Sequence, residues 1–570
     1  MLEPHQTVYM NCTFLRSFLP EKTETHHPKM GIVYFLVVLL FWPSLLASFP
    51  DTTVFNTHED GNFRSLVEQA CKDIDAHDSC ISNIQTHIEK SGRGRNPRSV
   101  LTAAIKAAHD EAKHAVEGIP TFTTLSISFR EQVAIDDCKE LLDFSVTELA
   151  WSMAEMSKIR QGKSGPDSGG NLKAWLSAAL SNQDTCLEGF EGTDRKLETL
   201  LRGSLRQVTQ LISNVLELYT QLNSLPFKPS RNETLQNYKN TPAAAPEWLS
   251  ELDESLVQAD PRGMNMNAVV AQDGSGKYRT ITEAIDEAPN HSNTRYVIYV
   301  KKGVYKENID MKKKKTNIMM VGDGIGQTII TGDRNFLQGL TTFRTATVAV
   351  SGKGFIARDI TFRNMAGPKN HQAVALRVDS DQSAFFRCSM EGYQDTLYAH
   401  SLRQFYRECE IYGTIDFIFG NGAAVLQNCK IYTRAPLPLQ KVTITAQGRK
   451  NPNQNTGFVI QNSYVLATQP TYLGRPWKLY SRTVYMSTYM SQMVQPRGWL
   501  EWFGNFALDT LWYGEYKNYG PGSAQSSRVK WAGFHFMDRP AAEFFTVGSF
   551  VDGRRWLPAT GVRFTAGLTN

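Results

Sequence analysis

The stretch FRCSMEGYQDTLYAHSLRQFYRECEIYGTIDFIFGN (residues 386–421) contains one motif twice. Aligning Cys388 with Cys409 also aligns Asp395 with Asp416, so the same residue types return after 21 residues. A return at this interval predicts a solenoid that climbs by one coil per repeat and stacks equivalent positions on adjacent coils. Adjacent strands lie about 4.8 Å apart. We therefore expect the two aspartates to be close neighbours.

A close pair of aspartates predicts acid–base chemistry. Two neighbouring carboxylates cannot both ionise cheaply, so one should remain an anion and the other should hold a proton. The alternative interpretation of any single aspartate is a turn residue or a solvated side chain. The neighbours favour chemistry, because the Gln394 amide can donate to an oxyanion and aromatic faces can contact a sugar ring. The aromatic residues around the pair are Tyr393, Tyr398, Phe417 and Phe419.

Five ordered motifs resemble the signature segments of plant pectin methylesterases. They are GVYKE (303–307), HQAVALR (371–377), GYQDTLY (392–398), GTIDFIFGN (413–421) and YLGRPWK (472–478). The resemblance extends from about Asn267 to Leu568, through GWLEW, EYKNYGPG and WLPATGV. It implies hydrolysis of galacturonate methyl esters in pectin, which gives methanol and de-esterified pectin.

The resemblance also implies a role for individual residues. Asp416, kept ionised by Arg475, would attack the ester carbon, and Asp395 would protonate the departing methanol and then activate water. Gln372 and Gln394 would donate hydrogen bonds to the oxyanion. Arg475 could instead form only a structural ion pair, and each aromatic residue could be core packing. The expected substrate-binding residues are Gln372, Arg475, Trp477, Tyr398, Phe419 and Trp502.

Two other functional classes compete with an esterase. A polygalacturonase or lyase on the same general fold would shorten the polymer, but the pair Gln394–Asp395 with Arg475 argues against it. A purely inhibitory or binding protein would release nothing, and the intact motifs argue against that. The sequence has no His or Cys cluster with zinc spacing and no Gly-rich loop followed by Lys and Ser/Thr. We therefore expect neither a metal nor an organic cofactor.

The pattern over residues 267–570 consists of short β runs, such as YVIYV, AVALRV and FVIQNS, each followed by a turn residue. Successive runs are separated by roughly one coil, and no tight two-residue hairpin connects them. We predict a C-terminal all-β domain folded as a right-handed parallel β-helix rather than a sandwich, and the family resemblance implies the same fold. Several runs end in residues that could stack as one internal ladder: Asn364, Cys388, Cys409, Asn428 and Asn462.

Residues 60–225 have a helical pattern. The segment LETLLRGSLRQVTQLISNVLELY (197–219) places its apolar residues on one face at helical spacing. Two further segments have the same helical pattern, so we predict an N-terminal all-α domain that forms an antiparallel four-helix bundle. The sequence leaves open whether this domain inhibits the adjoining enzyme or assists folding and export.

The helical region contains four cysteines, which allow three pairings. The separation of nine positions between Cys71 and Cys80 suits a short helical hairpin, so we favour this pair and Cys138 with Cys186. The arrangement resembles the invertase and pectin methylesterase inhibitor family, which implies the same pairing.

Three cysteines lie in the β region. Cys388 and Cys409 occupy equivalent positions of the repeat and could form a disulfide across adjacent coils, or could remain buried thiols. Pectin methylesterases often pair a cysteine near Cys429 with one in the downstream QN segment, where this chain has Ser463. Cys429 is therefore predicted to be free.

Residues 1–49 predict an N-terminal tail followed by a signal peptide or a signal anchor. Residues 31–49 are almost uninterrupted apolar sequence with basic residues on their N-terminal side, and Met30 is an alternative start. Each alternative sends the chain into the secretory pathway, where disulfides persist, and the resemblance implies the cell wall. Asn232 and Asn290 lie in sequons and are predicted glycosylation sites.

Residues 226–266, rich in Pro, Ala and polar residues, predict a linker. Related enzymes carry a basic processing motif after the WLS segment, where this chain has ESLV (254–257), so a processing protease would cut elsewhere, for example near Arg262, or not at all. The net charge of +5 does not predict a nucleic-acid partner and tolerates an acidic polysaccharide. The lysine run 312–315 is most simply a solvated turn, with contact to a polyanion as the alternative.

Overall fold

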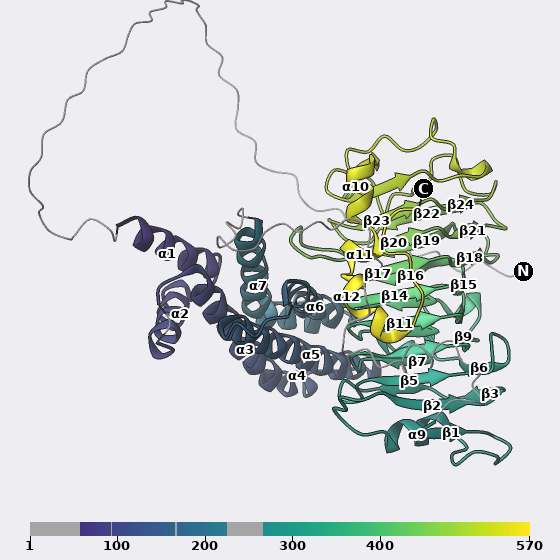
Figure 1. Cartoon of the computed structure of the whole chain (residues 1–570), viewed down its shortest axis with the longest axis horizontal. Coiled ribbons are helices and arrows are strands. Elements are labelled where there is room, and N and C mark those ends of the chain that lie inside the picture. Colours follow the sequence, from purple (N-terminus) through teal and green to yellow (C-terminus); the bar gives the residue numbers. More distant parts are fainter. Residues whose placement is uncertain (1–56, 93, 166–167, 225–265, 570) are drawn as a thin grey trace, which may run out of the picture. The chain divides into compact units, whose positions relative to one another are not determined.

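The computed structural model describes residues 57–224 and 266–569, apart from residues 93 and 166–167. Helices form the first of these ranges and parallel strands dominate the second (Figure 1). The predicted signal segment, the linker, Asn232 and the ESLV segment lie outside the described residues. Asn290 is exposed in a turn after a short helix. Within the described ranges, every helix is too short or too polar to cross a membrane.

The helical region is a helical bundle, and a small hairpin of two helices, α1 and α2, precedes it in the chain. Helices α3, α5, α6 and α7 pack against one another, which confirms the predicted four-helix bundle. Polar side chains fix two of the helix starts, because Asn96 caps α3 and Ser128 caps α5 through reciprocal capping boxes. The helices are α1 (Thr57–Ala70), α2 (His77–Lys90), α3 (Pro97–Gly118), α4 (Pro120–Thr123), α5 (Phe129–Arg160), α6 (Ser168–Glu188) and α7 (Lys196–Ser224).

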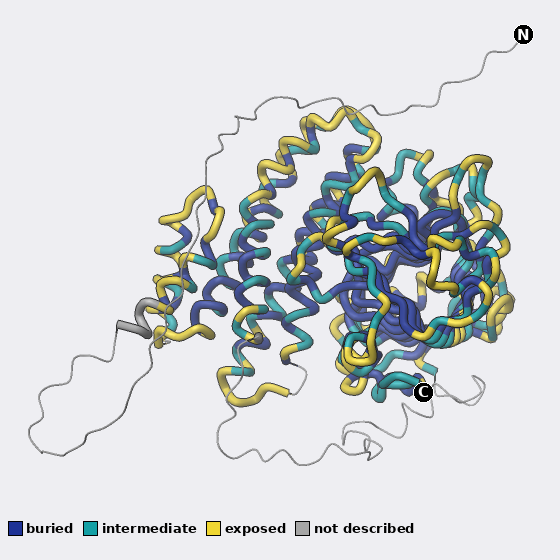
Figure 2. The backbone as a smooth tube through the Cα atoms, turned by 90° about the horizontal axis from the view of Figure 1, so that it is seen from above, coloured by how far each residue is buried: buried dark blue, intermediate teal, exposed yellow. Residues whose placement is uncertain are grey.

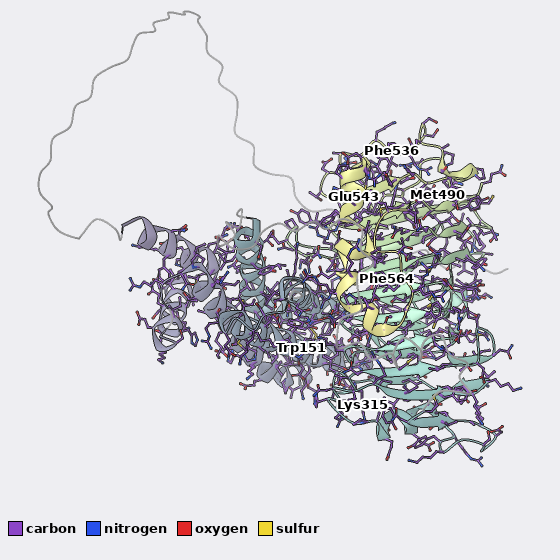
Figure 3. All side chains as sticks on the ribbon, viewed as in Figure 1. Trp151, Lys315, Met490, Phe536, Glu543 and Phe564 are labelled. Carbon is purple, nitrogen blue, oxygen red and sulfur yellow. A yellow bond between two sulfur atoms is a disulfide. The ribbon has the colours of Figure 1, made fainter. Side chains whose placement is uncertain are left out.

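Two disulfides hold this region together, as predicted. Cys71–Cys80 connects the end of α1 to α2 with a Cα–Cα distance of 5.8 Å. Cys138–Cys186 joins α5 to α6 with a Cα–Cα distance of 4.4 Å. The apolar residues of α7 at helical spacing are buried. Trp151 of α5, labelled in Figure 3, packs against Trp175 of α6 with a ring-centroid distance of 5.6 Å.

The second region is a β-helix of three parallel sheets, and its coils are stacked in chain order (Figure 1). The first sheet contains β1 (Ala268–Val270), β2 (Tyr296–Val300), β5 (Ile318–Val321), β8 (Ile356–Arg358), β11 (Ser383–Phe386), β14 (Arg403–Arg407), β17 (Ala423–Gln427), β20 (Gly457–Gln461), β23 (Arg482–Met486), β25 (Trp512–Tyr516) and β26 (Phe534–Phe536). The second contains β3 (Gly303–Lys306), β6 (Thr328–Gly332), β9 (Thr361–Asn364), β12 (Ser389–Glu391), β15 (Glu410–Gly413), β18 (Lys430–Thr433), β21 (Tyr464–Leu466) and β24 (Tyr489–Met490). The third contains β4 (Ile309–Met311), β7 (Val348–Val350), β10 (Leu376–Val378), β13 (Leu397–Ala399), β16 (Ile415–Gly420), β19 (Val442–Gln447) and β22 (Thr471–Pro476).

Short helices complete this region. Helix α9 (Ile281–Glu287) lies near the first strands. Helices α10 (Arg539–Phe544), α11 (Val547–Phe550) and α12 (Gly553–Trp556) follow the last strand and share an apolar cluster with the outer side of the first sheet. Phe564, labelled in Figure 3, extends this cover and lies 6.4 Å from the Phe405 ring. The strands themselves are largely buried, as Figure 2 shows.

The 21-residue repeat corresponds to the pairing of two adjacent coils, in which partner residues are 21 positions apart. Met390 of β12 pairs with Ile411 of β15, as the aligned motif requires. The predicted single ladder is wrong, because its members occupy three different positions at two corners. The cysteines stack in the turn between the first and second sheets. Asn428 and Asn462 lie in the same turn but one residue earlier than the cysteine position, with left-handed φ angles of 57° and 52°. Asn364 ends β9 at another corner.

The disulfide considered between Cys388 and Cys409 is absent, and both residues are buried free thiols, as is Cys429. Equivalent positions on parallel strands in register point their side chains the same way, so the sulfur atoms stack without facing each other. The Cys409 thiol donates to the carbonyls of Phe385 and Arg407, each at 3.4 Å. The prediction that Cys429 is free is confirmed.

The lysine run 312–315 is not a simple solvated turn. Lys315 (labelled in Figure 3) is only 7% exposed and donates to the carbonyls of Asp286 and Ala288 near the end of α9. These carbonyls end a helix, where a cation is favourable. Lys312 and Lys313 form ion pairs with α5 instead.

Candidate active site

Asp395 and Asp416 lie at equivalent positions of adjacent coils of the third sheet. Asp395 comes just before β13 and Asp416 lies in β16, and Leu397 pairs with Ile418. Both aspartates have left-handed backbone angles, with φ of 62° and 51°. Such angles are uncommon outside glycine and cluster at functional sites. The register of β16 slips next to Asp416, as a β-bulge does when it redirects a side chain.

Asp416 is held by the two following coils. Arg475 of β22 donates to both of its carboxylate oxygens, from Nε at 2.9 Å and from Nη2 at 2.6 Å. Thr443 of β19 donates its hydroxyl to Oδ1 at 2.6 Å and accepts the Asp416 N–H at 3.0 Å. Although burial disfavours the charged guanidinium, the carboxylate outweighs it and raises the pKa of Arg475. The bidentate, charge-assisted pair favours an ionised Asp416 with a fixed orientation.

Asp395 has the opposite environment. Burial raises the pKa of Asp395 well above its usual value, and the negative charges of Asp416 and Glu191 raise it further, while Arg475 opposes the shift. The environment of Asp395 therefore favours the protonated form of its carboxyl group. The two aspartates consequently differ in the way that a nucleophile and a general acid require.

A cavity of about 690 Å³ contains both aspartates together with Gln372, Gln394 and Arg475. The predicted aromatic platform lines the same cavity. Tyr398 and Phe419 stack at 4.1 Å between centroids, and Trp477 lies 6.0 Å from Phe419. The Arg475 guanidinium lies 4.3 Å from the centre of the Trp502 ring. The structure thus brings together every predicted catalytic and substrate-binding residue: Gln372, Gln394, Asp395, Asp416, Arg475, Tyr398, Phe419, Trp477 and Trp502.

Two of the aromatic residues near the motif have other positions. Phe417 is fully buried in the interior of the β-helix, because its side chain points to the opposite side of β16 from Asp416 and Phe419. Tyr393 lies under the Arg434 guanidinium, 5.1 Å from it, outside the cavity. Their proximity in sequence therefore does not place them in the site.

The cavity also contains residues of the helical bundle, which sequence analysis missed. Asp184, Thr185, Glu188 and Glu191, at and beyond the end of α6, line it opposite the catalytic residues. The Thr185 hydroxyl lies 2.9 Å from His400 Nε2.

Further contacts continue along α6. Asn421 donates to the Ser181 hydroxyl at 2.8 Å, and the Trp175 indole donates to Asp381 at 2.9 Å. The bundle core and the platform residues Tyr398 and Phe419 belong to one apolar cluster. The bundle therefore covers the catalytic cleft.

Among the residues that sequence analysis missed, Thr443 has the closest link to the chemistry. It lies in the run VTITAQ, which has the pattern of an ordinary buried strand. Only the register of β19 against β16 places its hydroxyl beside Asp416. The described residues contain no cluster of His, Cys, Asp or Glu that could hold a metal ion.

Comparison with known proteins identifies the family. A family model described as Pectinesterase matches residues 267–554, half of the chain. The chain belongs to the pectinesterase family. A second model, Plant invertase/pectin methylesterase inhibitor, matches residues 65–218 in the helical region. The two matches follow the division into bundle and β-helix.

Individual pectinesterases are similar over most of the chain. Pectinesterase/pectinesterase inhibitor 22 of Arabidopsis thaliana is 74% identical over 552 residues, which cover 95% of this chain and 100% of that protein. Pectinesterase/pectinesterase inhibitor PPE8B of Prunus persica is 50% identical over 479 residues, covering 82% of this chain and 89% of that protein. The solved pectin methylesterase from carrot is 57% identical, with a TM-score of 0.53, and covers 53% of this chain and 98% of its own.

Proposed function

We propose that this protein hydrolyses the methyl esters of galacturonate units in pectin, releasing methanol and leaving de-esterified pectin. Membership of the pectinesterase family supports this reaction. The observation that carries the proposal is the asymmetric aspartate pair: Asp416 is bound by Arg475, whereas Asp395 is buried and its pKa is raised by that burial and by the charge of Asp416. The cell wall, where pectin lies, is the proposed place of action.

The first half of the reaction forms an acyl-enzyme. An oxygen of the Asp416 carboxylate attacks the ester carbonyl carbon and gives a tetrahedral intermediate. The amides of Gln372 and Gln394 donate hydrogen bonds to its oxyanion. The intermediate collapses, the bond to the methoxy oxygen breaks, and Asp395 gives its proton to that oxygen, so methanol leaves.

The second half releases the acid. Asp395, now a carboxylate, takes a proton from a water molecule as that water attacks the acyl carbon. The bond to Asp416 breaks, which returns Asp416 to its ionised form beside Arg475 and leaves a galacturonic acid unit, which then loses its proton to the surrounding water. Asp395 ends protonated again, ready for the next ester. No step requires a group beyond these side chains and water.

We further propose that the helical bundle inhibits the enzyme while it is docked. Thr185 and Glu188 line the cleft that the polymer must enter, and Glu191 acts on Asp395 from the bundle side. A bundle that only assisted folding or export would have no need to occupy the cleft. A polymer and the bundle cannot share this space, so activity requires the bundle to move away or be removed.

Methanol release from highly esterified pectin tests both proposals. Three proteins are compared: the two-domain protein (residues 57–570), the catalytic part (residues 266–570) and the catalytic part with Asp416→Ala. We expect an active catalytic part, a slow two-domain protein and an Asp416→Ala variant with about a thousandth of the activity or less. Equal rates in the first two proteins would refute inhibition and leave the esterase.

A matched control separates chemistry from folding. Asp359→Asn changes another aspartate with left-handed φ, 59°, which lies at a corner of the β-helix and does not line the cavity. We expect this variant to keep its activity. If correctly folded catalytic part releases no methanol, the proposed reaction is wrong.

A further inference from the structure

Six ion pairs join the bundle to the β-helix among the residues that the structure describes, and they share one polarity. Each of the six places its carboxylate on the bundle and its cation on the β-helix. They are Asp137–Arg344, Glu140–Arg344, Glu140–Lys312, Glu148–Lys313, Asp184–Lys450 and Glu188–Lys478. The bundle thus presents carboxylates to cations of the β-helix. A polyanion bound to this surface of the β-helix would do the same.

Two of these cations lie inside the catalytic cleft. Lys450 follows β19 and Lys478 follows β22, and both line the cavity that contains the aspartate pair. The Lys478 ammonium lies 2.5 Å from Glu188 Oε1, and both side chains are only about a quarter exposed, at 27% and 25%. Asp184 makes the corresponding ion pair with Lys450. When the bundle leaves, both ammonium groups lose these carboxylates and face the cleft.

The neighbouring aromatic residue links the cations to a sugar. Trp477 belongs to the proposed platform, and the Lys478 Nζ lies 5.1 Å from the centre of its ring. A galacturonate ring stacked on Trp477 would have its carboxyl group within reach of this ammonium. An esterified unit is neutral and gains little from the lysine, whereas a de-esterified unit carries the charge that the lysine can bind.

We propose that Lys450 and Lys478 form a binding site for the carboxylates of already de-esterified galacturonate units, and that Asp184 and Glu188 of the bundle imitate these carboxylates. The proposal rests on the proposed function, because it takes pectin as the polymer. It adds that the product of the reaction and the bundle compete for the same two lysines.

Binding of a fully de-esterified oligogalacturonate to the catalytic part tests the site directly. The catalytic part has apolar clusters made of its own residues, and it matches the carrot enzyme over 98% of that chain, so we expect it to fold alone. Calorimetry at low ionic strength should show that Lys450→Gln and Lys478→Gln each weaken binding by about fivefold. Added salt should reduce the difference in affinity between the unchanged catalytic part and these variants, because the contacts are partly exposed.

Lys306→Gln is the matched control. Lys306 is exposed on β3 of the second sheet and does not line the cleft, so its loss should leave the affinity unchanged. Unaltered affinity in both Lys450→Gln and Lys478→Gln, in protein with a normal melting temperature, overturns the site. A loss of the same size in Lys306→Gln also overturns it, because the effect would then be one of net charge.

The two-domain protein tests the imitation. It should bind the oligogalacturonate at least about tenfold more weakly than the catalytic part, because Asp184 and Glu188 occupy the lysines. Equal affinities overturn this half of the proposal. The result does not depend on catalysis: lysine-dependent binding in protein that releases no methanol would keep the site and reject the proposed reaction.

Discussion

The β-helix and the helical bundle carry their functional residues in opposite ways. In the β-helix, Asp395 and Asp416 occupy equivalent positions of adjacent coils, and Arg475 reaches Asp416 from two strands further along the same sheet. The bundle has no such repeat, and its carboxylates Asp137 and Glu188 find their cations on the β-helix. The β-helix therefore contains a complete site, whereas the functional face of the bundle is defined only by what it contacts.

The largest expected effect concerns the site that the β-helix builds alone. Arg475→Gln removes the bidentate partner of Asp416, so we expect methanol release by the catalytic part to fall by about a thousandfold, or about 4 kcal/mol. Arg363→Gln is the control, since Arg363 pairs with Glu391 at 2.7 Å on the second sheet, away from the cleft. Near-normal activity in Arg475→Gln would show that the ion pair is only structural.

The second prediction separates the stabilities of the two regions. Replacing Cys138 and Cys186 by alanine opens a loop of 48 residues and should cost the bundle about 4 kcal/mol. The pair Cys71–Cys80 spans 9 residues, so its removal should cost less, about 2.5 kcal/mol. Scanning calorimetry of the two-domain protein should show the bundle transition shifting while the β-helix transition stays in place. Equal shifts for the two disulfides would contradict this order.

The third prediction concerns the contact between the regions. Arg344→Gln leaves the buried Asp137 without its cation, which should weaken docking by about 3 kcal/mol, or about a hundredfold. Methanol release by the two-domain protein should rise towards that of the catalytic part. The same substitution in the catalytic part alone should leave methanol release unchanged, because Arg344 does not line the cleft. A two-domain variant as slow as the unchanged protein would refute the role of this pair.

The fourth prediction is a pH dependence of docking. Burial raises the pKa of Asp137 to about 6, so docking takes up a proton. The strengthening of docking by protonation of Asp137 is complete below pH of about 4 and is lost as the pH rises through 6. Although burial opposes it, Arg344 lowers the pKa of Glu140 to about 2, which weakens docking only below pH of about 4.5. Docking should thus be about tenfold stronger at pH 5 than at pH 7.

The rate of the two-domain protein, divided by that of the catalytic part at the same pH, measures this dependence. The ratio should be about tenfold lower at pH 5 than at pH 7. Asp137→Asn cannot ionise and should remove most of the difference. A ratio that is constant with pH in the unchanged protein would be inconsistent with proton uptake on docking.

The smallest effect is expected in the cysteine stack of the β-helix. Cys409→Ser should cost at most about 1 kcal/mol, because a hydroxyl can donate to the same kind of carbonyl. Ser463 already does so further along this stack, donating to the Gln461 carbonyl at 2.9 Å. Thermal unfolding of the catalytic part measures the cost. A loss as large as that of the Cys138–Cys186 disulfide would mean that the thiol has a further role.

Much of the catalytic site could be predicted because it repeats along the chain. The 21-residue offset places Asp395 beside Asp416, and the family motifs supply Gln372, Gln394 and Arg475. Thr443 could not be predicted, since its strand has no distinguishing pattern. Phe417 shows the same limit: its neighbours in sequence line the cavity while its own side chain faces the interior.

The sequence by itself determined the two fold classes, the Cys71–Cys80 pair and the aspartate pair. Each of these depends on a period or a short separation along the chain, which fixes local geometry before any distant contact forms. Only the tertiary structure decided that Cys388 and Cys409 stay apart, that Lys315 is buried, and that α6 covers the cleft. The contact between Glu188 and Lys478 joins residues almost 300 positions apart. No period connects such residues, so their meeting depends on how two finished surfaces fit together.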